Sequence, residues 1–488
     1  MTPSRTPPRE GADIGMAADA DGSRRSLASL PPPAARKHRR GGPRQEGQFM
    51  GHVMDRESTS GSALGHGPGA GGGTPAPPRR IRRGATAVAA LLAFAAATSC
   101  ASAYGSAGSG TPSHEPSPGS TASVAADPSS TRISAPHLPR PTGSQPVGTT
   151  SLYLKDTSRV DPWVPGTKAR ELMVSLWYPA KSRSGKRAPY MTAKESELIL
   201  KGEEIPGVPY DALSRTRTNA VIDAEPAGRR HSLPLVVLSP GFTEPRSSLT
   251  ALAEELASRG YVVAGIDHTY ESLATTFPDG RVTTCVACEA PKDQEFWNTV
   301  GRSRAADVSF VLDELTGAHP EWKGALLIAP SRIAMAGQSA GGASTIAAML
   351  KDTRVRAGID MDGTTFAPIP DGGLSRPFLF LGTQAMHSPG GKDTTWDRDW
   401  AHLTGWKRWL VVTGAEHASF TDTALLVEQL GIYRNPGLSG ERAVEITRSY
   451  ARAFFDLHLR HKPQPLLNEP SKRYPEVKLC DAEPKTCA

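Results

Sequence analysis

The sequence predicts an α/β fold in which a mostly parallel central sheet is covered by helices on both faces. One observation is a series of short β-rich runs, several of them continuously apolar, as strands buried on both faces should be. Another is that stretches with apolar residues at helical spacing separate these runs, an alternation typical of parallel sheets with crossover helices. The expected strands are residues 172–179, 233–239, 261–267, 331–337, 356–362, 376–382 and 408–414.

Three apolar stripes mark the clearest helices between and after these strands. Their members are Leu249, Leu252, Ala253 and Leu256, then Val308, Val311, Leu312 and Leu315, then Ile446, Tyr450, Phe454 and Leu457. The first stripe stops at Gly260, a residue type that commonly ends a helix. We interpret all three stripes as core-facing surfaces and assign them no chemistry.

Composition separates the folding part of the chain from an N-terminal part without apolar periodicity. Residues 1–78 are rich in Pro, Gly, Arg and Ser, and we expect them not to fold. In residues 101–150, Ser, Gly, Pro, Thr and Ala fill 38 of 50 positions, which predicts a flexible linker because little apolar surface is available to offset ordering. A folded domain is expected over residues 151–465, followed by a C-terminal tail with two cysteines over residues 466–488.

Residues 79–100 have the layout of a secretory signal peptide, with four arginines, an apolar run of about a dozen small residues, and Cys100 at the end. That run is shorter than the ~20 residues that span a membrane. Cleavage before Cys100 would place lipid on this cysteine and attach the protein to the outer face of the cell membrane. Cleavage after Ala103 would release the protein from the cell. Export is expected in both cases.

The formal charge of +7 resides in the first hundred residues, which hold 14 Lys and Arg against 7 Asp and Glu. The remaining chain has 42 residues of each sign. An exported part without net charge has no electrostatic basis for binding nucleic acid, so no such partner is expected.

Besides Cys100, the chain has four cysteines, an even set that favours two disulfides in an oxidising compartment. The local pairing of Cys285 with Cys288 and of Cys480 with Cys487 is one of three connectivities. A zinc site built on the Cys285 and Cys288 pair is an alternative.

One Gly-x-Ser-x-Gly pentapeptide, from Gly337 to Gly341, carries the candidate chemistry. In a chain with 48 glycines its chance expectation is roughly a few tenths, so its context must decide. Ser339 follows an expected strand and precedes a small-residue helix, and this strand, turn and helix are what a nucleophile elbow requires. We therefore predict that Ser339 is the nucleophile of an α/β-hydrolase. The alternative is a tight turn without chemistry.

A nucleophilic serine needs a histidine to remove its proton and a carboxylate to fix the tautomer of that histidine. His417 lies directly after the last expected parallel strand, at the sheet edge where Ser339 emerges, and is the expected base. Asp362 ends the strand after the nucleophile's helix and is the expected acid. Asp360 lies deeper in that strand, and the loop after the next strand has no carboxylate until Asp393.

The remaining histidines of this region are interpreted as solvated surface residues. They are His387, His402, His458 and His461. The oxyanion of an acyl-transfer intermediate needs backbone N–H donors, one of them from the residue after the nucleophile. We therefore expect the amides of Ala340 and of Phe242 to donate, because Gly241 lets the chain turn closely just before Phe242.

Five motifs and an early SLWYPA strand occur in an order that resembles the plasma-type platelet-activating factor acetylhydrolases and their bacterial relatives. The motifs are PLVVLSPGF, LASRGYVVAGIDH, GQSAGGAS, RAGIDMDG and GAEHASF. The resemblance covers roughly residues 150–465. It implies an α/β-hydrolase that needs no metal or other cofactor and removes short or oxidised acyl groups from phospholipids and simpler esters. By position it implies Ser339, Asp362 and His417 as the triad and the amides of Phe242 and Ala340 as oxyanion donors.

The chain departs from this family at Pro240, where His is frequent. The insertion at about 183–231 and four tryptophans are expected to wall the acyl site. The tryptophans are Trp396, Trp400, Trp406 and Trp409. SPGFT also resembles SPGYT of the cutinase-like polyester hydrolases, which carry their acid after the next strand. A peptidase or an acyltransferase would use the same triad, whereas a non-catalytic surface protein would need a broken one.

Overall fold

The computed structural model describes residues 135–488. The segment 1–78, the signal peptide with Cys100, and most of the expected linker lie outside the described residues.

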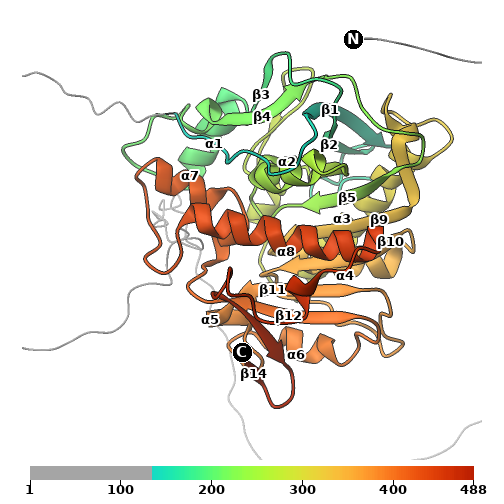
Figure 1. Ribbon diagram of the computed structural model, residues 1–488. Helices are drawn as coiled ribbons and strands as arrows, with labels where there is room; N and C mark the ends of the chain where they lie inside the picture. The colour runs from blue at the N-terminus through green and yellow to red at the C-terminus, as the bar shows by residue number, and fades with distance from the viewer. Residues whose placement is uncertain (1–134) are drawn as a thin grey trace, which may run out of the picture. The chain divides into compact units, whose positions relative to one another are not determined.

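Twelve strands of the described chain form one sheet, and two short strands form a separate hairpin (Figure 1). The strands are β1 Val147–Asp156, β2 Arg170–Pro179, β3 Arg187–Pro189, β4 Arg217–Ile222, β5 Leu233–Ser239, β6 Val262–Asp267, β7 Thr275–Thr276, β8 Val282–Thr283, β9 Ile328–Gln338, β10 Val355–Met361, β11 Phe378–Thr383, β12 Lys407–Val412, β13 Val477–Asp481 and β14 Thr486–Cys487. The order in the large sheet is β14-β13-β12-β11-β10-β9-β5-β6-β2-β1-β4-β3.

The centre of this sheet is parallel, from β6 through β5, β9, β10 and β11 to β12. All seven expected strands are present, and six of them form this centre because their apolar runs are buried on both faces. The seventh, β2, joins β6 antiparallel. The carboxyl ends of parallel strands meet at one edge of the sheet, so residues after β5, β9, β10 and β12 are brought together there.

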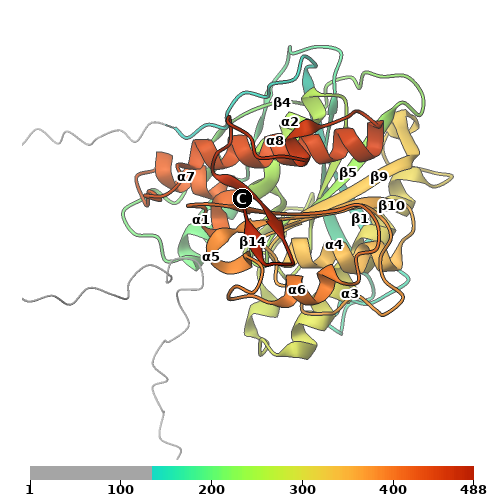
Figure 2. The same ribbon diagram turned by 60° about the horizontal axis from the view of Figure 1, so that its bottom comes forward.

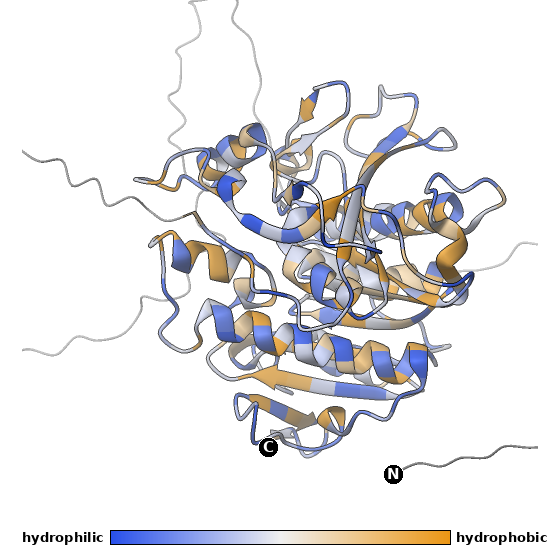
Figure 3. Ribbon diagram, turned by 45° about the horizontal axis from the view of Figure 1, so that its top comes forward, coloured by the Kyte–Doolittle hydropathy of each residue, from blue (hydrophilic) through white to orange (hydrophobic). Residues whose placement is uncertain are grey.

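Helices cover both faces of the sheet (Figure 2). They are α1 Ala193–Gly202, α2 Thr250–Ser258, α3 Gln294–Thr316, α4 Ala340–Lys351, α5 Gln384–His387, α6 Thr395–Trp400, α7 Thr423–Gln429 and α8 Gly440–Arg460. Short 3₁₀ turns are η1 Leu213–Arg215, η2 Arg246–Leu249, η3 Val286–Glu289, η4 Ala325–Leu327, η5 His417–Phe420 and η6 Pro465–Leu467. Figure 3 shows helices banded with hydrophilic and hydrophobic residues, as expected for helices with one face on a core.

Two apolar cores lie on the two sides of the sheet. The stripes of α2 and α8 belong to one core, which includes Leu252 and Phe454. The stripe of α3 belongs to the other core, with Val308 and with Ile346 of α4. The interpretation of the three stripes as core-facing surfaces is confirmed.

Residues 135–150, expected to be linker, are part of the folded domain. Leu138 is buried in a small core with residues of α7 and α8, and the Thr142 hydroxyl donates a hydrogen bond of 2.6 Å to Glu255. Val147 then begins β1. The linker boundary was wrong because β1 reads VGTTSLYLKD, whose small polar residues have the composition of the segment before it.

Residues 466–488, expected to be a separate tail, extend the sheet. β13 pairs antiparallel with β12, and β14 pairs with β13. The expected local disulfides are both present, Cys480–Cys487 across this hairpin and Cys285–Cys288 before α3. The second bond occupies both sulfurs of the alternative zinc site. Within residues 135–488, no helix combines the length and the apolar character that a membrane span requires.

Candidate active site

Ser339 stands at the turn between β9 and α4. Its backbone has φ of 55° and ψ of −124°, a conformation that L-residues rarely adopt and that is typical of a nucleophile elbow. The Ser339 amide donates to the carbonyl of Met361 at 2.9 Å, which ties the turn to the end of β10. The structure therefore holds Ser339 above the carboxyl edge of the parallel strands.

The two glycines of the pentapeptide permit the close approach that this turn needs. A Cβ atom on Gly337 would lie 2.1 Å from the carbonyl carbon of Gly341. A Cβ atom on Gly341 would lie 2.0 Å from the carbonyl oxygen of Ser239 at the end of β5. Side chains at either position would push α4 away from the sheet.

His417 and Asp362 form the hydrogen-bonded pair that the sequence predicts. The Nδ1–H group of His417 donates to Asp362 Oδ2 at 2.6 Å. The other oxygen of Asp362 accepts the backbone amide of Thr383 at 2.6 Å, which fixes the carboxylate. Asp362 is buried, whereas 45% of the His417 side chain is exposed, so the imidazole is open to a substrate. With Nδ1 protonated, Nε2 carries the lone pair that can accept a proton.

The other carboxylates near the elbow do not contact His417. Asp360 accepts the amide of Gly363, and burial raises its pKa well above the ordinary value. Asp393 accepts the Thr364 hydroxyl. These contacts leave Asp362 as the carboxylate within hydrogen-bond reach of the imidazole.

His387, expected at the surface, is buried behind Asp362. Its Nε2 lies 3.5 Å from Asp362 Oδ1, and its ring stacks on Trp396 with 4.0 Å between centroids. Burial lowers the pKa of His387, and the charges of Asp362 and Asp393 only partly oppose this, so the ring is neutral. The expectation was wrong because the surrounding sequence, TQAMHSPGGKD, reads as a polar loop, and nothing in it shows that Trp396 folds over the ring.

Gln338 links the elbow to the histidine. Its amide nitrogen lies 3.2 Å from His417 Nε2 and donates to the His417 backbone carbonyl at 3.1 Å. In this arrangement Gln338 occupies the nitrogen that would receive the Ser339 proton. Proton transfer from Ser339 therefore requires this contact to give way.

The pH dependence of the reaction follows from the pKa of His417. Burial lowers this pKa, but the hydrogen bond and charge of Asp362, with the charge of Glu244, outweigh burial and raise it above 6.5. A base must be neutral to act, so kcat/KM is expected to fall as pH drops through the raised pKa. In Asp362→Asn the acid limb of the residual activity should move to lower pH. A limb that does not move would show that Asp362 does not act on the base, and a pH series with p-nitrophenyl acetate measures this.

The expected oxyanion donors lie beside Ser339. The Ala340 amide is in the first turn of α4, where helix N–H groups have no acceptor within the helix. The loop after β5 packs against the elbow, since a Cβ atom on Gly241 would lie 3.5 Å from the Cβ atom of Ser339. Phe242 follows directly. Phe242 and Ala340 thus lie in one cluster beside the nucleophile.

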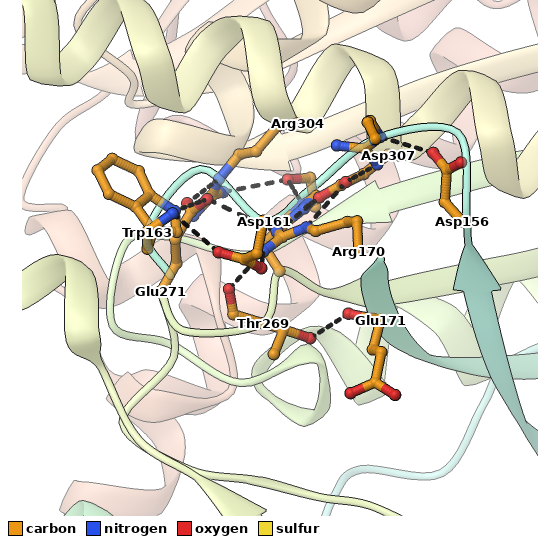
Figure 4. A network of polar contacts seen from close by, with 12 residues as sticks. Asp156, Asp161, Trp163, Arg170, Glu171, Thr269, Glu271, Arg304 and Asp307 are labelled. Carbon is orange, nitrogen blue, oxygen red and sulfur yellow. Dashed lines mark hydrogen bonds and ion pairs between the residues drawn. The ribbon is translucent and has the colours of Figure 1, made fainter. Parts of the chain in front are cut away.

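A buried polar network, which Figure 4 shows, contacts this loop through Arg304. Nη1 of Arg304 donates to the carbonyl of Pro240 at 2.6 Å, and Nη2 donates to the carbonyl of Gly241 at 3.4 Å. Nε of Arg304 donates to Glu271 at 2.8 Å, and Glu271 also accepts the indole N–H of Trp163 at 3.1 Å. Arg304 is 1% exposed. Its guanidinium therefore positions the carbonyls that precede the Phe242 amide.

The same network contains a second serine, histidine and aspartate in series. Ser239 Oγ lies 2.8 Å from His268 Nε2, and His268 Nδ1–H donates to Asp307 at 2.7 Å. All three are almost completely buried, and Arg304 donates to the Ser239 hydroxyl at 3.2 Å. Burial lowers the pKa of His268, with the charge of Arg304 adding to the effect. We interpret this set as support for the loop, because substrate does not reach a buried hydroxyl.

Replacing Arg304 is expected to lower kcat with little change in KM. In Arg304→Lys one point charge replaces a planar group that binds two carbonyls, so the loop shifts, and a misplacement of about 1 Å costs ~10²-fold in rate. Kinetics with p-nitrophenyl acetate, together with a thermal melt, measure this. Arg302→Lys is the control, since Arg302 is exposed on the same helix and pairs with Glu295. A folded Arg304→Lys protein with unchanged kcat would contradict the positioning role.

Aromatic side chains gather beside Ala340 and form what we call the aromatic wall. Its members are Trp163, Phe242, Phe296, Trp297 and Phe366. Trp297 and Phe366 stack face to face at 4.5 Å, and Phe242 meets Phe296 edge on at 5.4 Å. The tryptophans expected to wall the site lie elsewhere: Trp396 and Trp409 are buried in the core on the α3 and α4 side. The sequence did not indicate that α3 would bring aromatic residues to the elbow instead.

An apolar cavity of about 130 Å³ lies next to the η5 turn that carries His417, and we call it the His417 pocket. Glu416 and Ala418 line it on either side of His417, and Thr243 and Glu244 line it directly after Phe242. The insertion at about 183–231 contributes further walls through α1 and the segments before and after it. These are Tyr190, Met191, Ile199, Leu200, Glu203, Ile205 and Leu213.

Comparisons with known proteins agree with this architecture. The family model of platelet-activating factor acetylhydrolase, isoform II, matches residues 131–300 and 319–459. A probable 1-alkyl-2-acetylglycerophosphocholine esterase of Arthroderma benhamiae is 29% identical over 378 residues, covering 70% of this chain and 94% of that protein. The platelet-activating factor acetylhydrolase of Bos taurus is 24% identical, covering 66% of this chain and 77% of its own length.

A solved structure is also similar. The ferulic acid esterase from Streptomyces cinnamoneus is 42% identical, and the two structures superpose with a TM-score of 0.64 over 71% of this chain and all of that chain. The family model covers well over half of the sequence, and the sheet, elbow and relatives agree on an α/β-hydrolase that cleaves carboxylic esters. The chain belongs to the family of platelet-activating factor acetylhydrolase, isoform II.

Proposed function

We propose that the protein is an exported serine esterase that hydrolyses short-acyl esters or the acetyl esters of phospholipids through Ser339, His417 and Asp362. The observation that carries the proposal is the 2.6 Å hydrogen bond from His417 to Asp362 beside a serine held at positive φ. The relative from Arthroderma benhamiae supports the substrate class, because its name specifies an ester of this kind.

The geometry suits an acyl-enzyme reaction in two halves. Ser339 Oγ attacks the ester carbonyl carbon while His417 Nε2 takes its proton, and the amides of Phe242 and Ala340 donate to the oxyanion. His417 then gives the proton to the leaving alcohol oxygen as the ester C–O bond breaks, which leaves Ser339 acylated. Water attacks this ester with His417 as base, the acid departs, and the proton returns to Ser339.

A second substrate class is favoured by the aromatic wall. Stacked aromatic side chains provide flat apolar surfaces on which an aromatic acyl group can lie. The wall adjoins Ala340 and Phe242, the two expected oxyanion donors, and therefore the acyl side of the bond that is cleaved. The ferulic acid esterase that this chain resembles has an aromatic acid in its name. Hydroxycinnamoyl esters are accordingly the second candidate class.

Export is part of the proposal and rests on residues 79–100. Mass spectrometry of the mature N-terminus distinguishes two outcomes. Lipid on Cys100 would attach the enzyme to the outer face of the cell membrane, whereas cleavage after Ala103 would release the enzyme from the cell. A mature chain that retains residues 79–100 would contradict export by this signal.

The hydrolysis profile of the full chain tests the substrate class. The substrates are p-nitrophenyl esters of rising chain length and methyl ferulate, each with Ser339→Ala in parallel. A steep preference for acetate and butyrate that the variant loses supports the short-acyl proposal. A preference for methyl ferulate selects the aromatic class, and a preference for long chains or polyester film indicates a lipase or a cutinase-like enzyme. Transfer to an added alcohol in preference to water would indicate an acyltransferase, and cleavage of peptides a peptidase.

A further inference from the structure

A cleft of about 510 Å³ is bordered by α2 and α8, and we call it the arginine cleft. Its charged members are Arg140, Arg259, Arg442, Arg448, Arg452 and Arg473 with Glu255, Glu441 and Glu445. Six arginines are thus set against three glutamates, although the chain after residue 100 holds equal numbers of basic and acidic residues. None of the expected triad and oxyanion residues, all within residues 135–488, lines the cleft. This positive charge therefore gathers apart from the catalytic centre.

The carboxylate of Glu255 is fully engaged within the cleft. It accepts Nε of Arg259 at 2.7 Å and Nη2 of Arg448 at 2.8 Å, and it also accepts the amide and the hydroxyl of Thr142. Burial raises the pKa of Glu255, but the charge of Arg448 and the hydrogen bonds from Thr142 and Arg259 lower it to about 2. Each oxygen of this ionised group therefore accepts two bonds, which leaves none of its lone pairs for a further arginine.

The two other carboxylates of the cleft are also accounted for. Glu445 pairs with Arg442 and with Arg473, each at 2.9 Å, and Arg442 pairs in addition with Glu476 at 2.8 Å. Glu441 is exposed in the first turn of α8, where its charge suits the positive end of the helix dipole. The ion pairs of the cleft therefore involve four of its six arginines and leave two without a carboxylate.

The two remaining arginines are Arg140 and Arg452. Neither guanidinium makes a hydrogen bond or an ion pair with another residue of the described chain. Arg140 is exposed, and its backbone carbonyl accepts Nη2 of Arg448 at 3.2 Å. Arg452 is half-buried and follows Arg448 by one turn of α8. Both therefore lie near Arg448, and their N–H groups are open to a ligand from solvent.

A phosphate group matches this arrangement of donors. A guanidinium is planar and binds two phosphate oxygens through parallel N–H groups. A tetrahedral phosphate offers enough oxygens to bind two arginines at once, whereas a carboxylate offers only two. A hollow lined mostly by one sign of charge also concentrates ions of the opposite sign. The charge and the open donors of the cleft therefore both favour an anion of this kind.

We propose that the arginine cleft is a second binding site, which takes the phosphate group of an anionic lipid headgroup or of a soluble phosphate ester through Arg140 and Arg452. Arg448 adds positive charge between them without giving up its bond to Glu255. The ligand at this site is bound and not cleaved, so the site goes beyond the proposed esterase reaction and does not depend on it.

Calorimetric titration of the full chain with sn-glycerol 3-phosphate at low ionic strength tests the site. We expect saturable binding of one ligand per chain, which weakens as NaCl is added because the contacts are between charges. Arg140→Gln and Arg452→Gln should each weaken this binding about 10-fold, since each removes charged hydrogen bonds to the ligand. The double variant should bind still more weakly. Neither side chain has a partner in the fold, so thermal melts should be unchanged.

Vesicle co-sedimentation distinguishes the two sources of phosphate. If the ligand is a lipid headgroup, vesicles of phosphatidylglycerol should retain the wild type more than the double variant, and vesicles of phosphatidylcholine should retain neither through the cleft. If the ligand is a soluble ester, only the titration should separate the two proteins. The basic residues 1–100 are present in every protein compared, so only a difference between variants reports on the cleft.

A control with the same loss of charge combines Arg302→Gln and Arg356→Gln. Both arginines are exposed, in α3 and β10, and neither lines the cleft. This control should bind glycerol phosphate and vesicles as the wild type does. The proposal is overturned if the control loses as much binding as the variant of Arg140 and Arg452, or if neither ligand distinguishes that variant from the wild type. Hydrolysis of p-nitrophenyl acetate should be the same in all of these proteins, so the esterase proposal is judged separately.

Discussion

Replacing Ser339 by alanine is expected to lower kcat for p-nitrophenyl acetate about 10⁶-fold, because loss of the attacking oxygen removes the acyl-enzyme route entirely. The fold should persist, since no hydrogen bond from the Ser339 side chain holds the turn and alanine is smaller. Steady-state kinetics and a thermal melt measure the two effects. The residual rate should be that of direct attack by water on the bound ester, with the oxyanion donors still in place.

Ser331→Ala is the matched control for this variant. Ser331 lies in β9, the strand that leads to Ser339, but it is exposed near the opposite end of that strand. It should keep full activity. If the Ser339→Ala protein retained more than a few per cent of the wild-type rate, another nucleophile would have to be sought.

Asp362→Asn is expected to lower kcat about 10⁴-fold while leaving KM nearly unchanged. The asparagine can keep the bond from the Thr383 amide, but its other end no longer stabilises the imidazolium that forms as His417 takes the serine proton. It can also hold the imidazole in the wrong tautomer. Burial raises the pKa of Asp362, but the hydrogen bonds from His417 and from the Thr383 amide bring it below the ordinary value, so the carboxylate is ionised at neutral pH.

Asp393→Asn and Asp397→Asn are the comparisons for this variant. Asp393 accepts the Thr364 hydroxyl, and Asp397 accepts the Gly390 amide, so both act on loop structure and neither contacts His417. Their kcat values should stay within about 10-fold of the wild type. Near-normal turnover in Asp362→Asn with a large loss in either of the others would move the acid to that residue.

The parallel strands could be predicted because burial on both faces leaves a continuous apolar run, which is recognisable without knowing the neighbouring strands. VVAGID and LPLVVLS are of this kind. The outer strands were missed for the opposite reason. β1 exposes part of one face, so its alternation of Thr, Ser and Lys with apolar residues resembles the linker before it. A strand of this type is defined by its neighbour, β2, more than by its own composition.

The proximity of the expected site residues could be predicted because an elbow and strand ends are features of local order. Ser339, Asp362 and His417 each follow a recognisable strand, and the ends of adjacent parallel strands must meet. Long-range packing could not be derived in this way. The burial of His387 depends on Trp396, which stacks on its ring. The position of the loop that carries Phe242 depends on Arg304 of α3, which donates to the Pro240 carbonyl. Nothing near either residue in the sequence specifies its partner.

The short C-terminal hairpin has a consequence for how the molecule behaves in concentrated solution. At one rim of the sheet, β14 is two residues long and is joined to β13 by a disulfide; at the other rim, β3 is three residues long and ends in proline. Short, bridged or proline-containing rims give another chain little backbone to pair with. Without β13 and β14, the apolar strand β12 would present an open row of N–H and C=O groups, and copies of the protein could stack on one another through it. We therefore expect residues 477–488 to limit association between copies of the protein, a role separate from the chemistry at the carboxyl edge of the parallel strands.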